Sequence, residues 1–411
     1  MLRRIIIIFL FCLYLIEGRT QTLDNFIKSG LQNSPLLKDY QNQISSFSID
    51  SLMIKASQKP QINGNAQALY SPSYNNFGYD EAITNGGNYS ALAGISQPFL
   101  NRKTLENKYD NTRIQKLSVG NTLKISVNDL KRLITNQYIT AYSDYSDLSF
   151  NNSFLKLMHD EDGILKQLVE NGLYKQTDYL SFLIETQSQE MLVKQLNTQL
   201  KKEINLLNQI CGIADSGNYE INYPELTKQL PANPQSSPLF MQFKIDSLKI
   251  TNQKNAVDIR YKPKFNWIAD AGLLSSTPEN LYRHFGYSAG INFSMSIYDG
   301  EQRKLDYQKL SILENTRNNY EIFFKRQYNQ QLKQMNEELN SISEMRVQLN
   351  KQLKTAENLI AIEKAEMNTG NISITDYINA KKNYININRS LNQIKIRELQ
   401  IINDWNYLMQ K

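Results

Sequence analysis

The chain carries the same order of short motifs twice. Ser34-Pro35-Leu36 returns as Ser237-Pro238-Leu239 about 200 positions later, and the stretch 172–179 returns at 370–377 with its glycine and its Thr-Asp-Tyr run. A repeat of this length exceeds the roughly 20–50 residues of a solenoid unit. We therefore interpret the sequence as two related halves. Each half holds a helix, two strands and a long helical hairpin, in that order.

The first twenty residues have the pattern of a secretory signal peptide. Arg3 and Arg4 precede an apolar run from Ile5 to Ile16. This run is shorter than the roughly 20 apolar residues that a membrane-spanning helix needs. We predict a signal peptide over residues 1–20, and a signal anchor is the alternative.

Charge and motif content exclude several classes of function. The net charge is +6. Residues 1–20 hold three Arg and one Glu, so removing them leaves +4, which is too mild a bias to indicate nucleic acid as a partner. His159 and His284 lie far apart, and Cys211 is the one cysteine outside the leader, so no metal site or cofactor is expected. The sequence has no P-loop, Gly-x-Ser-x-Gly or zincin pattern, and we predict that the protein is not an enzyme.

Four segments alternate between apolar and polar residues, as β-strands do. They are about Gln61–Ser71, Asn88–Phe99, Lys264–Leu274 and Tyr287–Tyr298. Each has roughly the length of a tilted transmembrane β-strand. In the last segment Ile291 and Phe293 face one way, whereas Asn292 and Ser294 face the other. A soluble hairpin with one wet face is the alternative interpretation.

Most of the remaining sequence is predicted to be helical. Long hairpins are expected at about 102–211 and about 301–411, so the two repeats cover 21–211 and 238–411. The proline-rich stretch 212–237 is predicted to be an equatorial linker between them. Coiled-coil spacing is sustained over several heptads. It is seen at Phe182, Thr186, Gln189, Val193, Leu196, Leu200, Glu203, Leu207 and Ile210; at Leu332, Met335, Leu339, Ile342, Arg346, Leu349, Leu353, Ala356 and Ile360; and at Ala380, Tyr384, Ile387, Leu391, Ile394, Glu398, Ile401, Trp405 and Leu408.

Four strands cannot close into a barrel, and lipid does not tolerate an open sheet edge. One chain must therefore borrow strand edges from copies of itself. Three copies would supply twelve strands, an even number within the known range of membrane barrels.

The duplicated β-hairpins, the duplicated helical hairpins and the paired turn motifs resemble the TolC-like outer-membrane efflux family. The strand exit Tyr298-Asp299-Gly300 with Arg303 also fits this family. The resemblance covers about residues 22–411. It implies a mainly α fold with a transmembrane β-barrel portion, built as a homotrimer with a twelve-stranded barrel and a periplasmic α-helical tunnel.

The resemblance also implies a function and a set of partners. It implies a passive duct in the outer membrane of a Gram-negative bacterium, in contact with outer-membrane lipid and serving a tripartite efflux or type I secretion system. Its partners would be a periplasmic adaptor protein and an inner-membrane pump or ABC exporter. A periplasmic coiled-coil adaptor or scaffold is the alternative. Such adaptors have long helical hairpins too, but typically one rather than two that each follow a strand pair.

The turns at Gly172 and Gly370 are the candidate functional positions. Local physics predicts a glycine C-cap followed by an Asp or Thr N-cap for the next helix. The resemblance places both turns at the periplasmic entrance, where three copies would set Asp178 and Asp376 in a ring of carboxylates.

The resemblance gives further residues a role at this entrance. Asn379 stands where the family has a second aspartate. Met367 and Ile372 stand at the positions of its gate tyrosine and arginine, so a hydrophobic constriction is expected to replace the polar gate. The adaptor-docking turns of the family correspond to Gly172, Leu173, Gly370 and Asn371. A nearby acidic run, Asp160-Glu161-Asp162, is interpreted as a solvated patch that faces the adaptor, with a metal site as the alternative.

Overall fold

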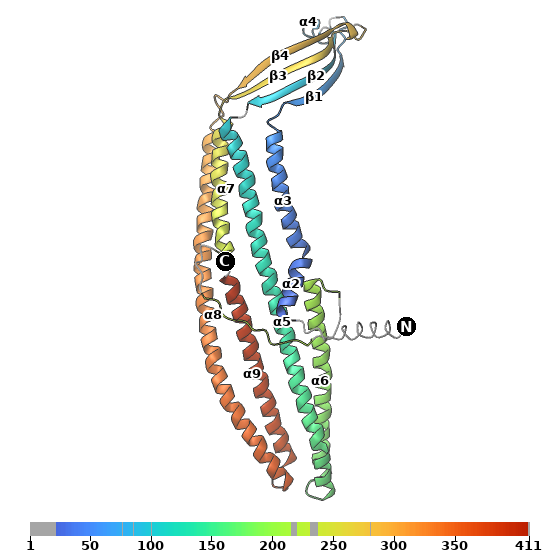
Figure 1. The fold of residues 1–411 in the computed structure, drawn as a ribbon, viewed down its shortest axis with the longest axis vertical. Coiled ribbons are helices and arrows are strands. Elements are labelled where there is room, and N and C mark those ends of the chain that lie inside the picture. Colours follow the sequence, from blue (N-terminus) through green and yellow to red (C-terminus); the bar gives the residue numbers. More distant parts are fainter. Residues whose placement is uncertain are drawn as a thin grey trace, which may run out of the picture. The chain divides into compact units, whose positions relative to one another are not determined.

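A computed structural model describes residues 22–75, 77–84, 86–99, 101–214, 220–230, 237–279 and 281–409. The predicted signal peptide, residues 1–20, lies outside them. Figure 1 shows the elements, which in chain order are α2 (Leu23–Asn33), α3 (Pro35–Ala56), β1 (Gln61–Tyr70), α4 (Glu81–Thr84), β2 (Gly87–Phe99), α5 (Arg102–Glu170), α6 (Gln176–Cys211), α7 (Pro238–Arg260), β3 (Lys264–Ser275), the 3-10 turn η2 (Leu281–Arg283), β4 (Phe285–Ser294), α8 (Gln302–Asn368) and α9 (Ile374–Leu408). No helix among the described residues is both long and apolar enough to cross a membrane.

The chain divides into two compact units, and both sequence repeats contribute to each unit. One unit comprises Met1–Lys38, Lys124–Pro238 and Phe324–Lys411. It contains α6, α9 and the adjoining parts of α5 and α8, which we call the hairpin unit. The other comprises Asp39–Leu123 and Leu239–Phe323. It contains the four strands and α7, and we call it the sheet unit.

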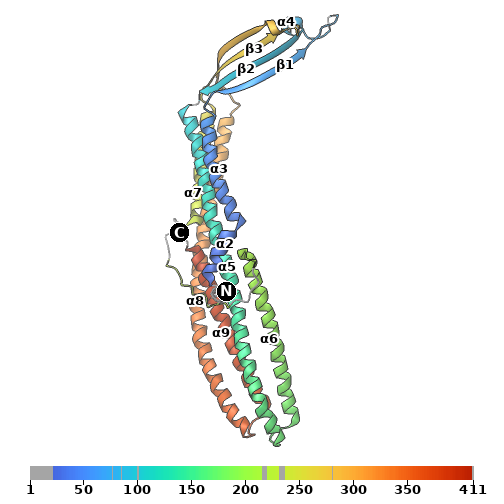
Figure 2. The same ribbon diagram turned by 45° about the vertical axis from the view of Figure 1, so that its right-hand side comes forward.

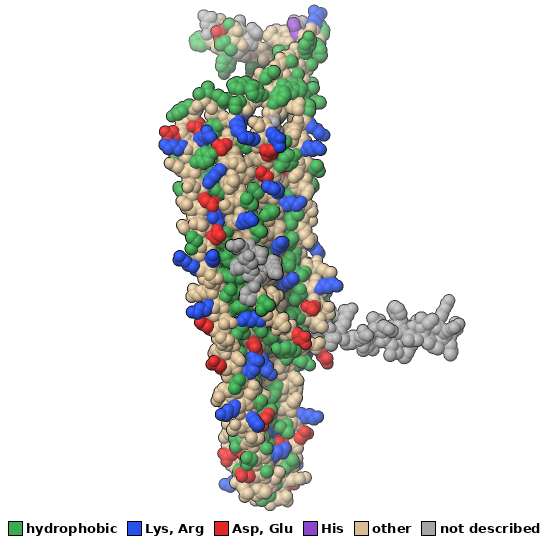
Figure 3. Space-filling view, turned by 60° about the vertical axis from the view of Figure 1, so that its left-hand side comes forward, with side chains coloured by type: hydrophobic (Ala, Val, Ile, Leu, Met, Phe, Trp, Pro, Cys, Tyr) green, Lys and Arg blue, Asp and Glu red, His purple; other side chains and the backbone are tan. Residues whose placement is uncertain are grey.

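The strands of the sheet unit form one antiparallel sheet in the order β1-β2-β3-β4. The register places Asn63, Gly94, Asp270 and Ser288 in one row across the sheet. The alternation seen in the sequence therefore lies in phase on all four strands. Apolar side chains gather over the strands, whereas charged side chains are scattered over the helices (Figure 3). One face carries Ile62, Ala66, Ala91, Ile95, Phe265, Trp267, Ala269, Ile291 and Phe293, and the other carries Asn63, Asn65, Ser90, Ser96, Asn266, Asp270, Ser288 and Asn292.

Strand β4 ends earlier than its sequence pattern indicates. The pattern continues to Tyr298, but the strand ends at Ser294. Ser294 pairs with Lys264, the first residue of β3, and Pro263 precedes it. Because β3 begins at Lys264, the residues after Ser294 have no strand beside them, among the residues that the structure describes, with which to continue the ladder.

The motif after β4 turns the chain into helix α8. Gly300 adopts a φ of 64°, which favours glycine. Asp299 then accepts a hydrogen bond from the Arg303 backbone N–H at 2.8 Å. The Arg303 side chain in turn contacts Asp258 of α7 at 2.6 Å. A capping carboxylate and an ion pair thus fix the first turn of α8 against α7.

The heptad positions in the long helices are buried or half-buried, as the sequence predicts. Phe182, Leu207 and Ile342 are almost fully buried. Two charged residues at heptad positions, Arg346 of α8 and Glu398 of α9, contact each other as an ion pair. These two charges occupy heptad positions that are normally apolar, and each neutralises the other across the α8–α9 pair.

The described part of the linker, residues 220–230, crosses the helices of the hairpin unit. The Tyr138 hydroxyl donates to the Asn222 carbonyl at 3.0 Å. Trp405 Nε1 donates to the Gln229 carbonyl, also of the linker, at 2.9 Å. These bonds tie the linker to α5 and α9.

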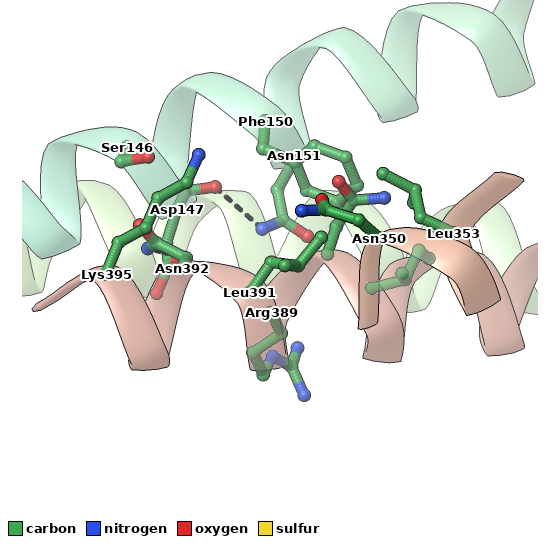
Figure 4. Close-up of a pocket in the computed structure, with 12 residues that line it drawn as sticks. Ser146, Asp147, Phe150, Asn151, Asn350, Leu353, Arg389, Leu391, Asn392 and Lys395 are labelled. Atoms are coloured by element: carbon green, nitrogen blue, oxygen red, sulfur yellow. Dashed lines mark hydrogen bonds between the residues drawn. The ribbon is translucent and has the colours of Figure 1, made fainter. Parts of the chain in front are cut away.

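A polar cavity of about 210 Å³ lies between α5, α8 and α9 in the hairpin unit. Across it, Asn392 Nδ2 donates to Asp147 Oδ1 at 2.6 Å. Asn151 and Asn350 also line the cavity (Figure 4). The volume and the polar lining suit ordered water.

A second polar cluster, centred on Asp144, lies between α5 and α6. Glu203 of α6 is 7% exposed and accepts from Gln137 at 2.8 Å and from Gln199 at 2.6 Å. Burial, together with repulsion from Glu203 and Asp147, raises the pKa of Asp144 to about 6. This carboxylate is therefore destabilised at neutral pH.

We expect Asp144→Asn to stabilise the protein at pH 8 but to have much less effect at pH 4. A carboxyl group with a raised pKa contributes stability that is fully present below its unfolded-state value of 3.8 and is lost as pH rises through its folded-state value, here about 6. Because Asp144 is only partly buried, solvent screening limits the expected gain to roughly 1–2 kcal/mol at pH 8. Thermal unfolding at the two pH values measures it. An equal gain at both would contradict the titration of Asp144.

Candidate functional site

The two candidate turns have the same local geometry. Gly172 and Gly370 both have a φ of 74°. The Leu173 N–H donates to the Leu168 carbonyl at 3.0 Å, and the Asn371 N–H donates to the Glu366 carbonyl at 3.0 Å. Each turn is therefore a helix C-terminus that is closed by a glycine in the left-handed region.

The expected Asp or Thr N-caps are wrong by a few residues. Helix α6 begins at Gln176 with Lys175 as its N-cap, and α9 begins at Ile374 with Ser373 as its N-cap. Asp178 and Asp376 are thus the third residues of their helices. At this position the positive end of the helix dipole stabilises a carboxylate. The Asp178 carboxylate accepts from the Lys175 N–H at 3.2 Å, as in a capping box.

The two turns contact each other directly. The Tyr174 hydroxyl lies 2.9 Å from the carbonyl oxygens of both Met367 and Ile372, one on each side of the second turn. A Cβ added to Gly370 would lie 3.3 Å from Leu173 Cδ2, whereas one added to Gly172 would meet no atom within 4 Å. The surface of the first turn is therefore more open than that of the second.

The predicted site residues fall into two groups. Asp376, Asn379 and Asn371 are exposed, Asp178 and Ile372 are half-buried, and Leu173 is 48% exposed. Met367 is fully buried in an apolar cluster with Phe182, Ile374 and other residues of α5, α6 and α9. Met367 therefore packs between the ends of the helices. Ile372 is the more accessible of the two apolar residues proposed for a constriction. Figure 2 shows the ends of α8 and α9 beside those of α5 and α6.

The interpretation of Asp160-Glu161-Asp162 as a solvated patch is wrong for its central residue. Glu161 of α5 is 1% exposed, and its side chain is buried between α5, α8 and α9. It forms an ion pair with Lys381 of α9, and it accepts from the Tyr377 hydroxyl at 2.6 Å. Lys364 of α8 approaches the same carboxylate at 3.3 Å. Three partners on α8 and α9 thus satisfy the buried Glu161 carboxylate of α5, and together the four residues form one network.

Lys381 is as deeply buried as its partner. Its ammonium lies 4.6 Å from the ring centroid of Tyr377 and 5.6 Å from that of Phe154. Burial lowers the pKa of Lys381, although the Glu161 carboxylate opposes that shift. Sequence reasoning missed this network. The spacing of Phe154, Met158, Glu161 and Leu165 is heptad-like and would have indicated that Glu161 faces inward.

Sequence reasoning also missed a carboxylate beside the candidate site. Burial, followed by repulsion from Asp376 and Glu366, raises the pKa of Glu363. The exposed Asp376 therefore lies close enough to Glu363 of α8 for the two carboxylates to repel each other. No group of three or more His, Cys, Asp or Glu in the described ranges is arranged to hold a metal ion.

Removing the buried ammonium should destabilise the helix ends strongly. We expect Lys381→Met to cost roughly 3–5 kcal/mol, because Glu161 would keep a buried charge after losing its closest partner. The neighbouring pair of Lys382 and Glu185, 2.8 Å apart and more exposed, provides a matched control. Lys382→Ala should cost at most about 1 kcal/mol. Thermal unfolding of both variants measures the difference. Similar losses would show that burial does not strengthen the Glu161 network.

Comparisons with known proteins give a structural match without a sequence match. No family model matches the chain, and no curated protein matches its sequence. A membrane protein from Pseudomonas aeruginosa has a TM-score of 0.77 at 12% identity, over 94% of this chain and 90% of that one. The outer membrane protein VceC from Vibrio cholerae has a TM-score of 0.75 at 12% identity, over 94% and 96%. The CmeC outer membrane channel of Campylobacter jejuni has a TM-score of 0.71 at 12% identity, over 94% and 85%.

These matches extend over nearly the whole chain. At 12% identity they establish the fold alone. The chain therefore has the fold of the TolC-like outer-membrane channels.

Proposed function

We propose that three copies of this chain form a passive outer-membrane duct that exports cargo from the periplasm to the exterior. The observation that carries this proposal is the sheet. Within the described chain, β1 and β4 each pair on one side only, and the sheet has one polar and one apolar face. A closed ring of such sheets removes the free edges and places the apolar face against lipid.

The helices support the same proposal. The two hairpins, α5–α6 and α8–α9, would continue below the barrel as a tunnel, with the turns at Gly172 and Gly370 at its entrance. VceC and CmeC, which share this fold, are described as an outer membrane protein and an outer membrane channel. The adaptor alternative gains no specific support, because it gives no role to an amphipathic four-stranded sheet.

The proposed partners are a periplasmic adaptor and an inner-membrane pump or ABC exporter. Adaptor docking is proposed at Gly172 with Leu173 and at Gly370 with Asn371. The open space around Gly172 and the exposed Leu173 favour the first turn as the closer approach for a partner helix. Heat-resistant migration as a trimer from outer-membrane fractions tests the assembly.

The orientation of the sheet can be tested with single cysteines on β4. We expect Asn292→Cys and Ser294→Cys to react with a water-soluble thiol reagent in the assembled protein, because these positions lie on the polar face. Ile291→Cys and Phe293→Cys should react slowly, because they would face lipid. Comparable rates at all four positions would contradict the barrel.

The entrance can be tested by conductance in planar bilayers. Asp376 is exposed and lies near Glu363, so in a trimer the carboxylates of Asp376 would attract cations to the entrance. We expect Asp376→Ala to weaken cation selectivity and block by multivalent cations, with a similar or smaller effect for Asp178→Ala. Asn379→Asp should strengthen both properties. If the double variant with both Asp178→Ala and Asp376→Ala keeps its selectivity and its block, the two aspartates only stabilise the N-termini of their helices.

A further inference from the structure

The polar face of the sheet carries one carboxylate, and it stands near the middle of a strand. Strands β1, β2 and β4 contain no Asp, Glu, Lys or Arg, and β3 contains only Lys264 and Asp270. Lys264 is the first residue of β3. Six residues of extended chain separate the two charges by about 20 Å. Lys264 is therefore too distant to neutralise Asp270 at ordinary ionic strength, where the Debye length is about 10 Å.

The surroundings of Asp270 leave its carboxylate accessible on that face. Its partner on β2 is Gly94, which has no side chain, and Gly272 follows two residues later on its own strand. On the other side, the Ser288 hydroxyl donates to Asp270 Oδ2 at 2.7 Å. One short hydroxyl therefore orients the carboxylate. On the β2 side, a Cβ added to Gly94 would meet no atom closer than 3.9 Å, so the space beside the carboxylate is open there.

We propose that Asp270 is a charge-selectivity residue of the strand section, which concentrates cations and repels anions inside the duct. The inference rests on the proposed function. If three sheets close with their polar faces inward, three Asp270 carboxylates form one ring at a single level of the barrel. Rings of carboxylates favour cations in pores. This ring is separate from the acids at the helix turns, because Asp270 belongs to the sheet unit and Asp178 and Asp376 belong to the hairpin unit.

A thiol close to Asp270 can report the local potential directly. Ser96 of β2 pairs with Ile268, so it is a diagonal neighbour of Asp270 on the same face. Such neighbours lie roughly 7–8 Å apart. Ser96→Cys would be made in a Cys12→Ser background, in which the remaining Cys211 is buried. Its reaction rates are measured in the assembled protein with a cationic trimethylammonium-ethyl and an anionic sulfonatoethyl methanethiosulfonate.

With Asp270 present, the cationic reagent should react faster than the anionic one at about 10 mM salt. Adding Asp270→Asn, which keeps the shape and the acceptor for Ser288, should lower the ratio of the two rates about two- to fivefold. The difference should disappear near 1 M salt. The controls Asp270→Glu, which keeps the charge, and Ser288→Ala, which removes only the hydroxyl, should preserve most of the ratio. Asp270→Ser provides the same comparison if Asp270→Asn does not assemble.

Two outcomes would overturn the inference, and they can be told apart. If Ser96→Cys reacts readily but the ratio of the two rates does not depend on Asp270, Asp270 does not set the local potential, and the duct itself stands. If Ser96→Cys is protected from both reagents while Ile95→Cys, on the apolar face, reacts, the sheet is oriented the other way. The proposed function then fails together with the inference.

Discussion

The unpaired edges of β1 and β4 are the constraint on which the rest of the structure depends. A four-stranded sheet with one apolar face cannot remain alone in lipid, because each free edge exposes backbone N–H and C=O groups. The register explains why copies of the same chain can solve this problem. On all four strands most apolar residues lie on the same face, so identical sheets can join edge to edge and keep that face continuous.

At the helix turns the governing interaction is the buried network around Glu161. Hydrophobic packing of Phe182, Met367 and Ile374 brings the helix ends together, but it does not fix their alignment along the helix axes. An ion pair between Glu161 and Lys381, with Tyr377 donating to the same carboxylate, is satisfied in one alignment only. Sliding α9 along α5 would leave a buried charge without its partner, and that is costly. The network therefore fixes the alignment of α5, α8 and α9 along their axes.

The sequence predicted the strands and helices well because their periodicity is sustained. The strand boundaries agree within about one residue, except at β4, whose end depends on where its partner β3 begins. Pairing between distant segments is not visible in a local pattern. The same limit explains the error at Glu161. Three successive acids suggest a solvated run, but successive helical residues point in different directions, so one of the three can face the core. Lys381, its partner, is 220 residues away.

The contact between the two turns uses backbone acceptors. The resemblance places the family's gate tyrosine and arginine at Met367 and Ile372, and this chain has neither side chain there. Tyr174, from the opposite turn, donates its hydroxyl towards the carbonyl oxygens of those same two residues. A main-chain acceptor does not depend on the identity of the side chain, so the contact tolerates the loss of the polar residues. A hydrogen bond between neutral groups is also much less sensitive to salt than an ion pair is. In the proposed duct, the charged residues near this site, Asp178, Asp376 and Glu363, would therefore be available to act on ions, because this contact between the turns does not use them.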